Sequence, residues 1–251
     1  MNSSLNKRLE ANLKQIGLST ILEIYEEVLK KASAQKKGTL WALDQLVAEE
    51  ARARFSRLVE RRIKAARIPV KKTLDSFDFN YPKKIDREQI LRLFELDFIE
   101  KKTNVCMISR SGLGKTHLAS ALALAACQQG HRVRFSTAID VVNQLQAAQS
   151  DDTFLRRLKS YLSPSVLVLD ELGYLPIDRH GADLLFQVIS GRYERGSVIL
   201  TTNRAFKEWA SVFNDATVAD AVINRIVHNS EVVTIEGKSF RLPPGQSDHA
   251  K

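Results

Sequence analysis

The sequence contains little cysteine and no long apolar run, and both shortages narrow the kinds of protein it can encode. Cys106 and Cys127 are the only cysteines among 251 residues, too few for a disulfide framework and at a spacing that matches no metal-ligand pattern. We interpret both as small core side chains. No stretch approaches the roughly 18 uninterrupted apolar residues of a membrane span, and the N-terminal MNSSLNKRLEANLK lacks the apolar run of a signal peptide. We therefore expect a cytoplasmic protein with no membrane partner.

Acidic residues are scarce in one segment, which makes the charge uneven along the chain. Of the net charge of +9, residues 1–72 carry +8 and residues 73–251 carry +1. Between residues 51 and 72, a single acid, Glu60, stands beside a basic run of Arg52, Arg54, Arg57, Arg61, Arg62, Lys64, Arg67, Lys71 and Lys72. Such density indicates a polyanionic partner, and we predict that these residues bind the phosphates of double-stranded DNA.

Helical spacing supports this interpretation, because four members of the basic run share one stripe that could follow a phosphate backbone: Arg54, Arg57, Arg61 and Lys64. Lys83 and Lys84 would extend the track. No base-reading helix stands out, so we expect weak sequence preference. The alternative is an ordinary solvated helix face.

Apolar spacings of three to five residues predict that residues 1–72 form a small, all-helical domain, with Thr39 as a cap between two helical stretches. The helical period stops after Pro69. Residues 73–82 then resemble an extended connector whose aromatic side chains, Phe77, Phe79 and Tyr81, pack on the next domain. We place the domain boundary between residues 72 and 73.

From Asn104 onward, short apolar strands alternate with amphipathic helices. The expected strands are NVCMIS, RVRFST, SVLVLDEL, SVILTTN and EVVTI, with helices from Lys115 and around residues 182–195. This alternation predicts an α/β fold in which helices cover both faces of a parallel sheet.

A candidate phosphate-binding loop follows the first strand: Ser109, Arg110, Ser111, Gly112, Leu113, Gly114, Lys115 and Thr116, with His117 next. It matches G-x-x-x-x-G-K-[ST] except that serine replaces the first glycine. Lys115 is expected at the β- and γ-phosphates of ATP and Thr116 at Mg²⁺, while the following helix directs its positive end toward the anion. If position 109 requires a positive φ, serine there strains the loop by about 1 kcal/mol and slows turnover.

Polar residues at the ends of two later strands complete the expected site. Asp170 is predicted to coordinate Mg²⁺, and Glu171 to polarise the attacking water. Asn203, at the end of SVILTTN, is predicted to orient that water between the other two motifs. In this order the three motifs favour an ATP hydrolase over the other P-loop class considered, a small-molecule kinase.

The chain resembles the IstB-type ATP-binding proteins of bacterial insertion sequences, which belong with the DnaC and DnaA branch of AAA+ ATPases. The matching stretches are RRIKAARIPVKKTLDSFDF, GLGKTHLASAL, LVLDELGYLP, ILTTN and INRIVHNSEVVTIEGKSFR. The resemblance implies a helical N-terminal domain and, over residues 73–251, an AAA+ core without the usual C-terminal lid. It also implies ATP-dependent assembly of a homo-oligomer on DNA, and recruitment and stimulation of a partner transposase. A replicative helicase loader of the DnaC type is the alternative.

The resemblance further assigns roles to single residues. The Walker A role falls on the 109–116 loop, Walker B on Asp170 and Glu171, and sensor 1 on Asn203. Arg225 resembles the arginine finger that a neighbouring subunit inserts at the γ-phosphate, which would make the subunit interface ATP-bridged. Other arginines remain open alternatives. Arg192 and Arg195 are candidates for subunit contacts, and Arg241 either contacts nucleotide or lies on the surface.

Overall fold

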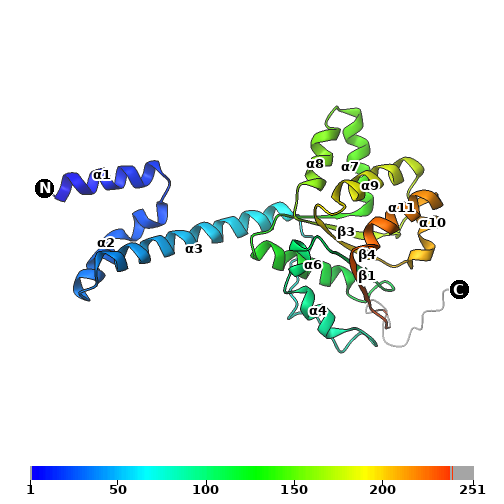
Figure 1. The fold of residues 1–251 in the computed structure, drawn as a ribbon, viewed down its shortest axis with the longest axis horizontal. Coiled ribbons are helices and arrows are strands. Elements are labelled where there is room, and N and C mark those ends of the chain that lie inside the picture. Colours follow the sequence, from blue (N-terminus) through cyan, green and yellow to red (C-terminus); the bar gives the residue numbers. More distant parts are fainter. Residues whose placement is uncertain (1, 238, 240–251) are drawn as a thin grey trace. The chain divides into compact units, whose positions relative to one another are not determined.

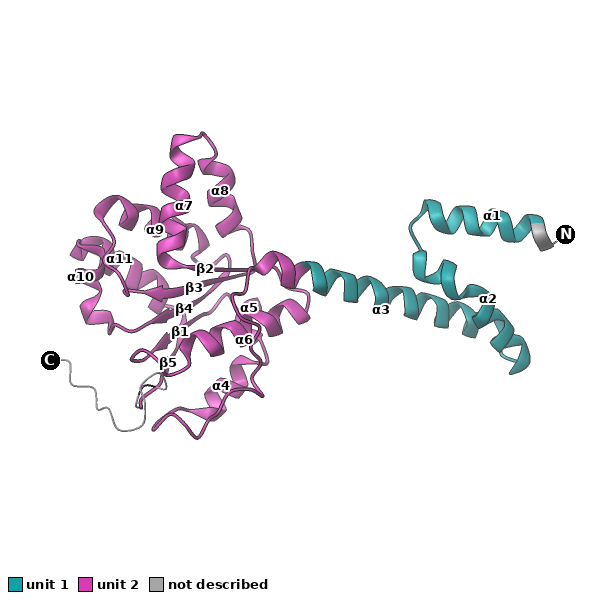
Figure 2. Ribbon diagram, turned by 180° about the vertical axis from the view of Figure 1, so that it is seen from behind, with its two compact units in different colours: residues 1–61 teal, residues 62–251 magenta. Residues whose placement is uncertain are grey.

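The computed structural model describes residues 2–237 and 239, and the chain divides into two compact units, residues 1–61 and 62–251 (Figure 2). The division falls within the long helix α3 (Thr39–Ala66). The boundary that the sequence suggests after residue 72 stays a prediction. In the described part of the chain, no helix is long and apolar enough to cross a membrane.

The N-terminal unit is helical, as predicted, and contains α1 (Asn2–Gln15), α2 (Ser19–Ala34) and most of α3. A small core of Leu13, Ile21 and Tyr25, with Leu46 of α3 packed against it, joins these helices. Because so little apolar surface is buried there, polar contacts must contribute to holding the helices together.

One such contact is the buried carboxylate of Glu50 on α3. It accepts hydrogen bonds from the backbone N–H groups of Thr20 (2.9 Å) and Ile21 (3.2 Å), and so caps the start of α2. Arg54 and Arg57 pair with the same carboxylate at 2.9 Å and 3.3 Å. Burial raises the pKa of Glu50, but the hydrogen bonds outweigh it and the pKa lies below its usual value. Two arginines of the basic run therefore also stabilise the helical unit.

The second unit contains a five-stranded parallel sheet within the described residues, as the sequence predicts (Figure 1). The strands are apolar and mostly buried, and their spatial order is β2-β3-β4-β1-β5. Their bounds are β1 (Asn104–Ile108), β2 (Val133–Thr137), β3 (Val166–Leu172), β4 (Ser197–Thr202) and β5 (Ser230–Thr234).

Helices cover both faces of this sheet. They are α4 (Arg87–Leu93), α5 (Asp97–Glu100), α6 (Lys115–Gln128), α7 (Ala138–Ser150), α8 (Phe154–Leu162), α9 (Arg179–Arg192), the 3₁₀ helix η1 (Phe206–Glu208), α10 (Trp209–Phe213) and α11 (Ala216–Val227). Side-chain caps begin several of them: Asp86, Thr137, Asp178 and Asp215.

Alternate strand residues face two separate cores. Val105 and Met107 pack with α4, α5 and α6, whereas Cys106 packs with α7, α9 and α11. Burial raises the pKa of the Cys106 thiol to about 12 and that of Cys127 to about 11. Both cysteines are core side chains, as expected.

The connector ahead of the sheet packs onto the second unit. Phe77 and Phe79 contact each other edge to face, with ring centroids 4.9 Å apart, and join the core beside α6, as predicted. Tyr81 stays exposed. Further on, Lys84 and Glu236 exchange backbone hydrogen bonds of 3.1 Å and 2.9 Å, which join the connector to the end of β5.

No helix lies between the end of β5 and residue 237. The absence of a C-terminal lid stays a prediction. For Arg241 the sequence analysis allowed either a contact with nucleotide or a position on the surface. This residue lies outside the described part of the chain.

The side chain of Arg192 lies in the core, which contradicts the suggestion that it makes contacts between subunits. Only 1% of the residue is exposed. Its guanidinium donates to five backbone carbonyls: those of Tyr161 (2.9 Å), Leu162 (3.3 Å), Pro164 (3.0 Å), Ser165 (3.2 Å) and Ser197 (2.8 Å). Burial lowers its pKa to about 10. Arg192 therefore joins α8, α9 and β4 within one chain and is wrong as a candidate for subunit contacts.

We predict that Arg192→Met lowers the free energy of unfolding by about 3 kcal/mol or more, because it leaves buried carbonyls without donors. Arg195→Met is the matched control, since Arg195 is exposed one turn away and its loss should cost under about 0.5 kcal/mol. Urea unfolding of the full chain measures both. Equal stability of the two variants would contradict the structural role of Arg192.

Candidate nucleotide site

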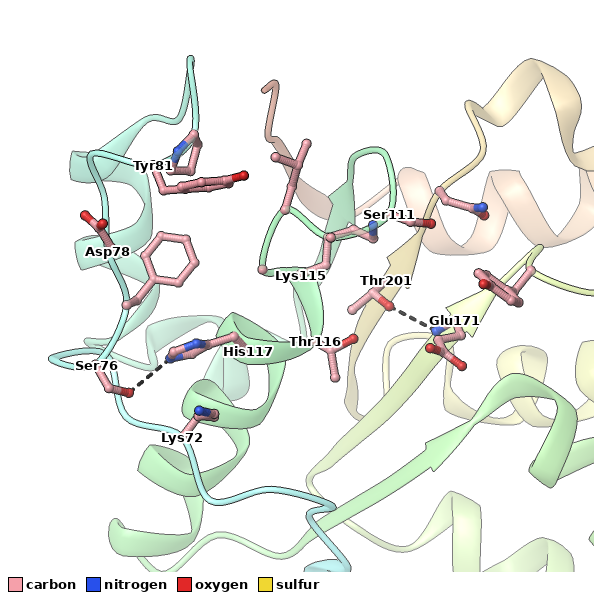
Figure 3. Close-up of a pocket in the computed structure, with 17 residues that line it drawn as sticks. Lys72, Ser76, Asp78, Tyr81, Ser111, Lys115, Thr116, His117, Glu171 and Thr201 are labelled. Carbon is pink, nitrogen blue, oxygen red and sulfur yellow. Dashed lines mark hydrogen bonds between the residues drawn. The ribbon is translucent and has the colours of Figure 1, made fainter. Parts of the chain in front are cut away.

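A cleft of about 470 Å³ lies at the carboxyl ends of the strands (Figure 3). The phosphate loop, the ends of β3 and β4, and the connector line it; the lining residues are Lys72, Ser76, Phe77, Asp78, Tyr81, Pro82, residues 111–117, Glu171, Tyr174, Thr201 and Asn203. The carboxyl ends of a parallel sheet are where ligands bind in open α/β folds.

The strand order brings the three predicted motifs together. β4 lies between β1 and β3, and Ile108 pairs with Thr202 while Leu169 pairs with Leu200. Asn203 therefore lies between the phosphate loop and the acidic pair, where the sequence analysis expected it. Its Oδ1 atom is buried and has no hydrogen-bond partner among the described residues.

Two glycines give the phosphate loop its shape. Gly112 and Gly114 have φ angles of +81° and +87°, which favour glycine. A Cβ on Gly114 would also lie 2.6 Å from Cε2 of Phe77, so a larger side chain there would require the Phe77 ring to shift. The loop leads directly into α6, whose N-terminus is favourable for an anion.

Ser109, which replaces the first glycine of the motif, fits the loop without the strain that a positive φ would cause. It is not among the described residues with positive φ, so the condition for strain is not met. Its hydroxyl donates to the Arg110 carbonyl (3.0 Å) and accepts from Lys115 Nζ (3.1 Å). Lys115 Nζ also donates to the carbonyls of Ser109 (2.7 Å) and Arg110 (3.0 Å). To reach a phosphate, Lys115 must exchange these contacts for phosphate oxygens.

Asp170 connects the phosphate loop to the sheet. Its carboxylate is buried and accepts the Thr116 hydroxyl at 3.0 Å on both oxygens. The Thr201 hydroxyl on β4 also donates to it. A hydroxyl and a carboxylate side by side supply the oxygen ligands that Mg²⁺ prefers, so these residues fit the metal of a bound nucleotide.

Glu171 points into the cleft because β3 is irregular at its end. The β3–β4 register shifts between Leu169 and Leu172, and Glu171 has a φ of +61°. Its N–H donates to the Thr201 hydroxyl at 3.0 Å, and its carboxylate is exposed at the cleft (Figure 3). Left-handed backbone at a non-glycine residue costs about 1 kcal/mol or more and is typical of functional sites.

Lys72 and the connector after it contribute residues that the sequence analysis did not place in the nucleotide site. Lys72, predicted to bind DNA, lines the cleft. His117 Nε2 lies 3.0 Å from the Thr73 carbonyl and 3.2 Å from the Ser76 hydroxyl, so it holds the connector as well as lining the cleft. The sequence feature that could have indicated this position for Lys72 is a basic residue immediately before an aromatic connector.

Arg225, the expected finger, is held on its own chain. Its guanidinium lies over the Phe186 ring, 4.8 Å from the centroid, and donates to the Ala221 carbonyl at 3.1 Å. It is not one of the cleft residues of its own subunit. Arg195 is exposed. The finger role of either arginine stays a prediction.

A parallel sheet in this order, with a phosphate loop after β1 and an acidic pair ending β3, defines a P-loop ATP-binding protein of the AAA+ class. The sequence model of the IstB-like ATP binding proteins matches residues 11–247. The chain therefore belongs to the IstB-like ATP-binding protein family, as the resemblance indicated.

Comparison with individual relatives supports the same family assignment. A protein of Geobacillus stearothermophilus named for ATP binding and insertion sequence IS5376 is 34% identical over 238 residues, 95% of each chain. One of Pseudomonas aeruginosa named for IS21 is 36% identical over 234 residues, 93% of this chain and 88% of its own. The solved DnaC helicase loader has a TM-score of 0.55 at 23% identity, over 65% of this chain and 96% of its own, which shows a shared fold.

We predict that Lys72→Ala weakens ATP binding by about tenfold or more, because a charged hydrogen bond or ion pair of this kind is worth roughly 1.5–3 kcal/mol. Lys71→Ala is the control, since Lys71 is exposed next to it but does not line the cleft. Titration with a fluorescent ATP analogue measures both affinities. Equal affinities of the two variants would remove Lys72 from the nucleotide site.

Proposed function

We propose that the chain is an ATP-hydrolysing regulator of transposition, which assembles on double-stranded DNA and recruits and stimulates a partner transposase. The observation that carries the proposal is the hydrogen bond between Thr116 and Asp170 beside Lys115. Family membership supports the proposed role in transposition, because the relatives are named for insertion sequences. The proposed cofactors are ATP and Mg²⁺, the metal being held by Thr116 and Asp170.

The proposed reaction is transfer of the γ-phosphoryl group to water. Mg²⁺ would offset the charge that develops on the phosphates. Glu171 would accept the proton of the attacking water, a role that the exposure of its carboxylate at the cleft supports. Asn203 would orient that water, a role supported by its buried Oδ1, which has no hydrogen-bond partner among the described residues. Lys115, on leaving the loop carbonyls, would bind the β- and γ-phosphates.

The proposed assembly depends on a cation supplied by a neighbouring subunit. Arg225 is our candidate, and its contact with the γ-phosphate would make the assembled state more stable with ATP than without it. Repetition of the basic run along a duplex would then convert weak phosphate contacts into strong binding by avidity.

The proposed DNA surface is narrower than the whole basic run. Arg54 and Arg57 already pair with Glu50, and Lys72 lines the cleft. The remaining exposed members are Arg61, Lys64, Arg67 and Lys71, together with Arg52, which pairs with Glu49 at 2.7 Å. Mutation of Arg54 is a poor test, because it would also remove a partner of the buried Glu50 carboxylate.

We predict that Glu171→Gln preserves ATP binding, slows hydrolysis by about 10²–10⁴-fold and leaves long-lived DNA complexes, because the γ-phosphate contact persists. Lys115→Ala should abolish ATP binding and, with it, assembly on DNA. Single-turnover hydrolysis and DNA dissociation rates in ATP measure these effects. Release of DNA by the Glu171→Gln protein as fast as by the parent would contradict the coupling, as would equally tight and cooperative DNA binding without nucleotide.

We also predict that Arg61→Gln with Lys64→Gln weakens DNA binding and reduces the slope of log affinity against log salt by about 1–2, since each lost phosphate contact lowers the slope by about 0.9. Lys30→Gln with Lys31→Gln is the charge-matched control on α2, outside the basic run. Fluorescence anisotropy at several salt concentrations measures the slopes. A parent affinity that does not fall between low and moderate salt would exclude a phosphate-dominated interface.

A further inference from the structure

One buried hydroxyl links the two acidic residues near the end of β3. Thr201 lies on β4, is buried, and forms part of the cleft wall. Its hydroxyl donates to the Asp170 carboxylate and accepts the N–H of Glu171 at 3.0 Å (Figure 3). Because an ionised carboxylate can only accept, the single hydroxyl proton points to Asp170 and an oxygen lone pair is left for Glu171. A single oxygen atom therefore makes both contacts, each with a defined direction.

The strand pairing explains why Glu171 needs a contact of this kind. Two residues of β3 lie opposite one residue of β4 here, since the register shifts between Leu169 and Leu172. Such a bulge takes a residue out of the regular ladder of the sheet and turns its side chain in a new direction. The Thr201 hydroxyl accepts the N–H of Glu171 in place of a backbone carbonyl. A side chain of β4 thus completes the hydrogen bonding of the irregular strand beside it.

The backbone conformation at this bulge is one that glutamate does not prefer. Glu171 has a φ of +61°, in the left-handed region that is unfavourable for residues with a Cβ. The free energy of one hydrogen bond is of the same order as the cost of such a conformation. Loss of the Thr201 hydroxyl should therefore release Glu171 toward ordinary backbone angles, and its carboxylate should lose its fixed direction at the cleft.

The metal site has a support of its own, so it should survive the loss of this hydroxyl. Thr116 Oγ1 lies 3.0 Å from both oxygens of Asp170. Removal of the Thr201 hydroxyl leaves that pair in contact, whereas Glu171 loses the acceptor of its N–H. A defect in hydrolysis with ATP binding retained is what separates positioning of the base from general support of the site.

We propose that Thr201 is a positioning residue for ATP hydrolysis, which holds the backbone of Glu171 so that its carboxylate faces the attacking water. The inference rests on the proposed function, in which Glu171 is the base, and names the residue that sets the geometry of that base. Thr201 acts through Glu171 rather than on the phosphates. Serine carries the same hydroxyl and can take its place, whereas valine has the shape of threonine without the hydroxyl.

The test compares Thr201→Val with Thr201→Ser in the full chain. We expect Thr201→Val to slow single-turnover hydrolysis in Mg²⁺ and duplex DNA by about 10–100-fold, while the affinity for a fluorescent ATP analogue changes by less than about threefold. Thr201→Ser should hydrolyse ATP within about threefold of the parent rate. Thr202→Val is the matched control and should keep the parent rate, since Thr202 is equally buried on β4 but its hydroxyl contacts the backbone of Arg204.

A second measurement places the same change in the Glu171→Gln protein. Because Thr201 acts through Glu171, Thr201→Val should slow that protein by less than about twofold beyond the loss that Glu171→Gln alone causes. Thr201→Ala removes the same hydroxyl and should give the same pattern if Thr201→Val does not fold. If both variants fail to fold while Thr202→Val folds, Thr201 is needed for stability alone, which overturns the inference.

The outcomes separate the positioning role from the proposed function. If Glu171→Gln is slow as proposed but Thr201→Val hydrolyses ATP as fast as the parent, the positioning role is wrong and the proposed base stands. Equal slowing by Thr201→Val with and without Glu171, or a loss of ATP affinity that matches the loss of rate, would also overturn the inference. If Glu171→Gln hydrolyses ATP as fast as the parent, the proposed base itself is wrong, and the positioning role is wrong with it.

Discussion

The arrangement of the site depends on the buried carboxylate of Asp170 and the two hydroxyls that donate to it. Thr116 belongs to the first turn of α6 and Thr201 to the end of β4, so this one side chain joins the phosphate loop, β3 and β4. Thr201 in turn accepts the N–H of Glu171. A buried carboxylate is costly unless its oxygens are satisfied, and here the groups that satisfy it are the ones that position the metal site and the proposed base.

This arrangement prepares the site for nucleotide before nucleotide arrives. Thr116 and Asp170 are already side by side, and Glu171 already faces the cleft (Figure 3). Lys115 is the exception, because its ammonium group is held by the loop carbonyls. Binding therefore requires the exchange of one set of charged hydrogen bonds for another. Preorganisation of the remaining groups reduces the cost of reorganisation during the reaction.

The sheet, the phosphate loop and the acidic pair could be predicted because each has a local signal: continuous apolar strands, glycines before a lysine, and carboxylates at a strand end. Long-range contacts had no such signal. Arg192 looked like a surface residue on an amphipathic helix, and only the folded chain brings the carbonyls of α8 and β4 to it. Arg54 and Arg57 likewise pair with a carboxylate that caps another helix. Lys72 reaches the cleft only because the connector folds back along α6.

The most direct measurement is the structure of this chain with Mg²⁺ and a non-hydrolysable ATP analogue. The account predicts that Mg²⁺ is held at Thr116 and Asp170, that Thr201 keeps its hydrogen bonds to Asp170 and Glu171, and that Lys115 has left the Ser109 and Arg110 carbonyls for phosphate oxygens. A nucleotide bound outside this cleft would contradict the account. So would a complex in which Asp170 has separated from both hydroxyls and lies away from the metal.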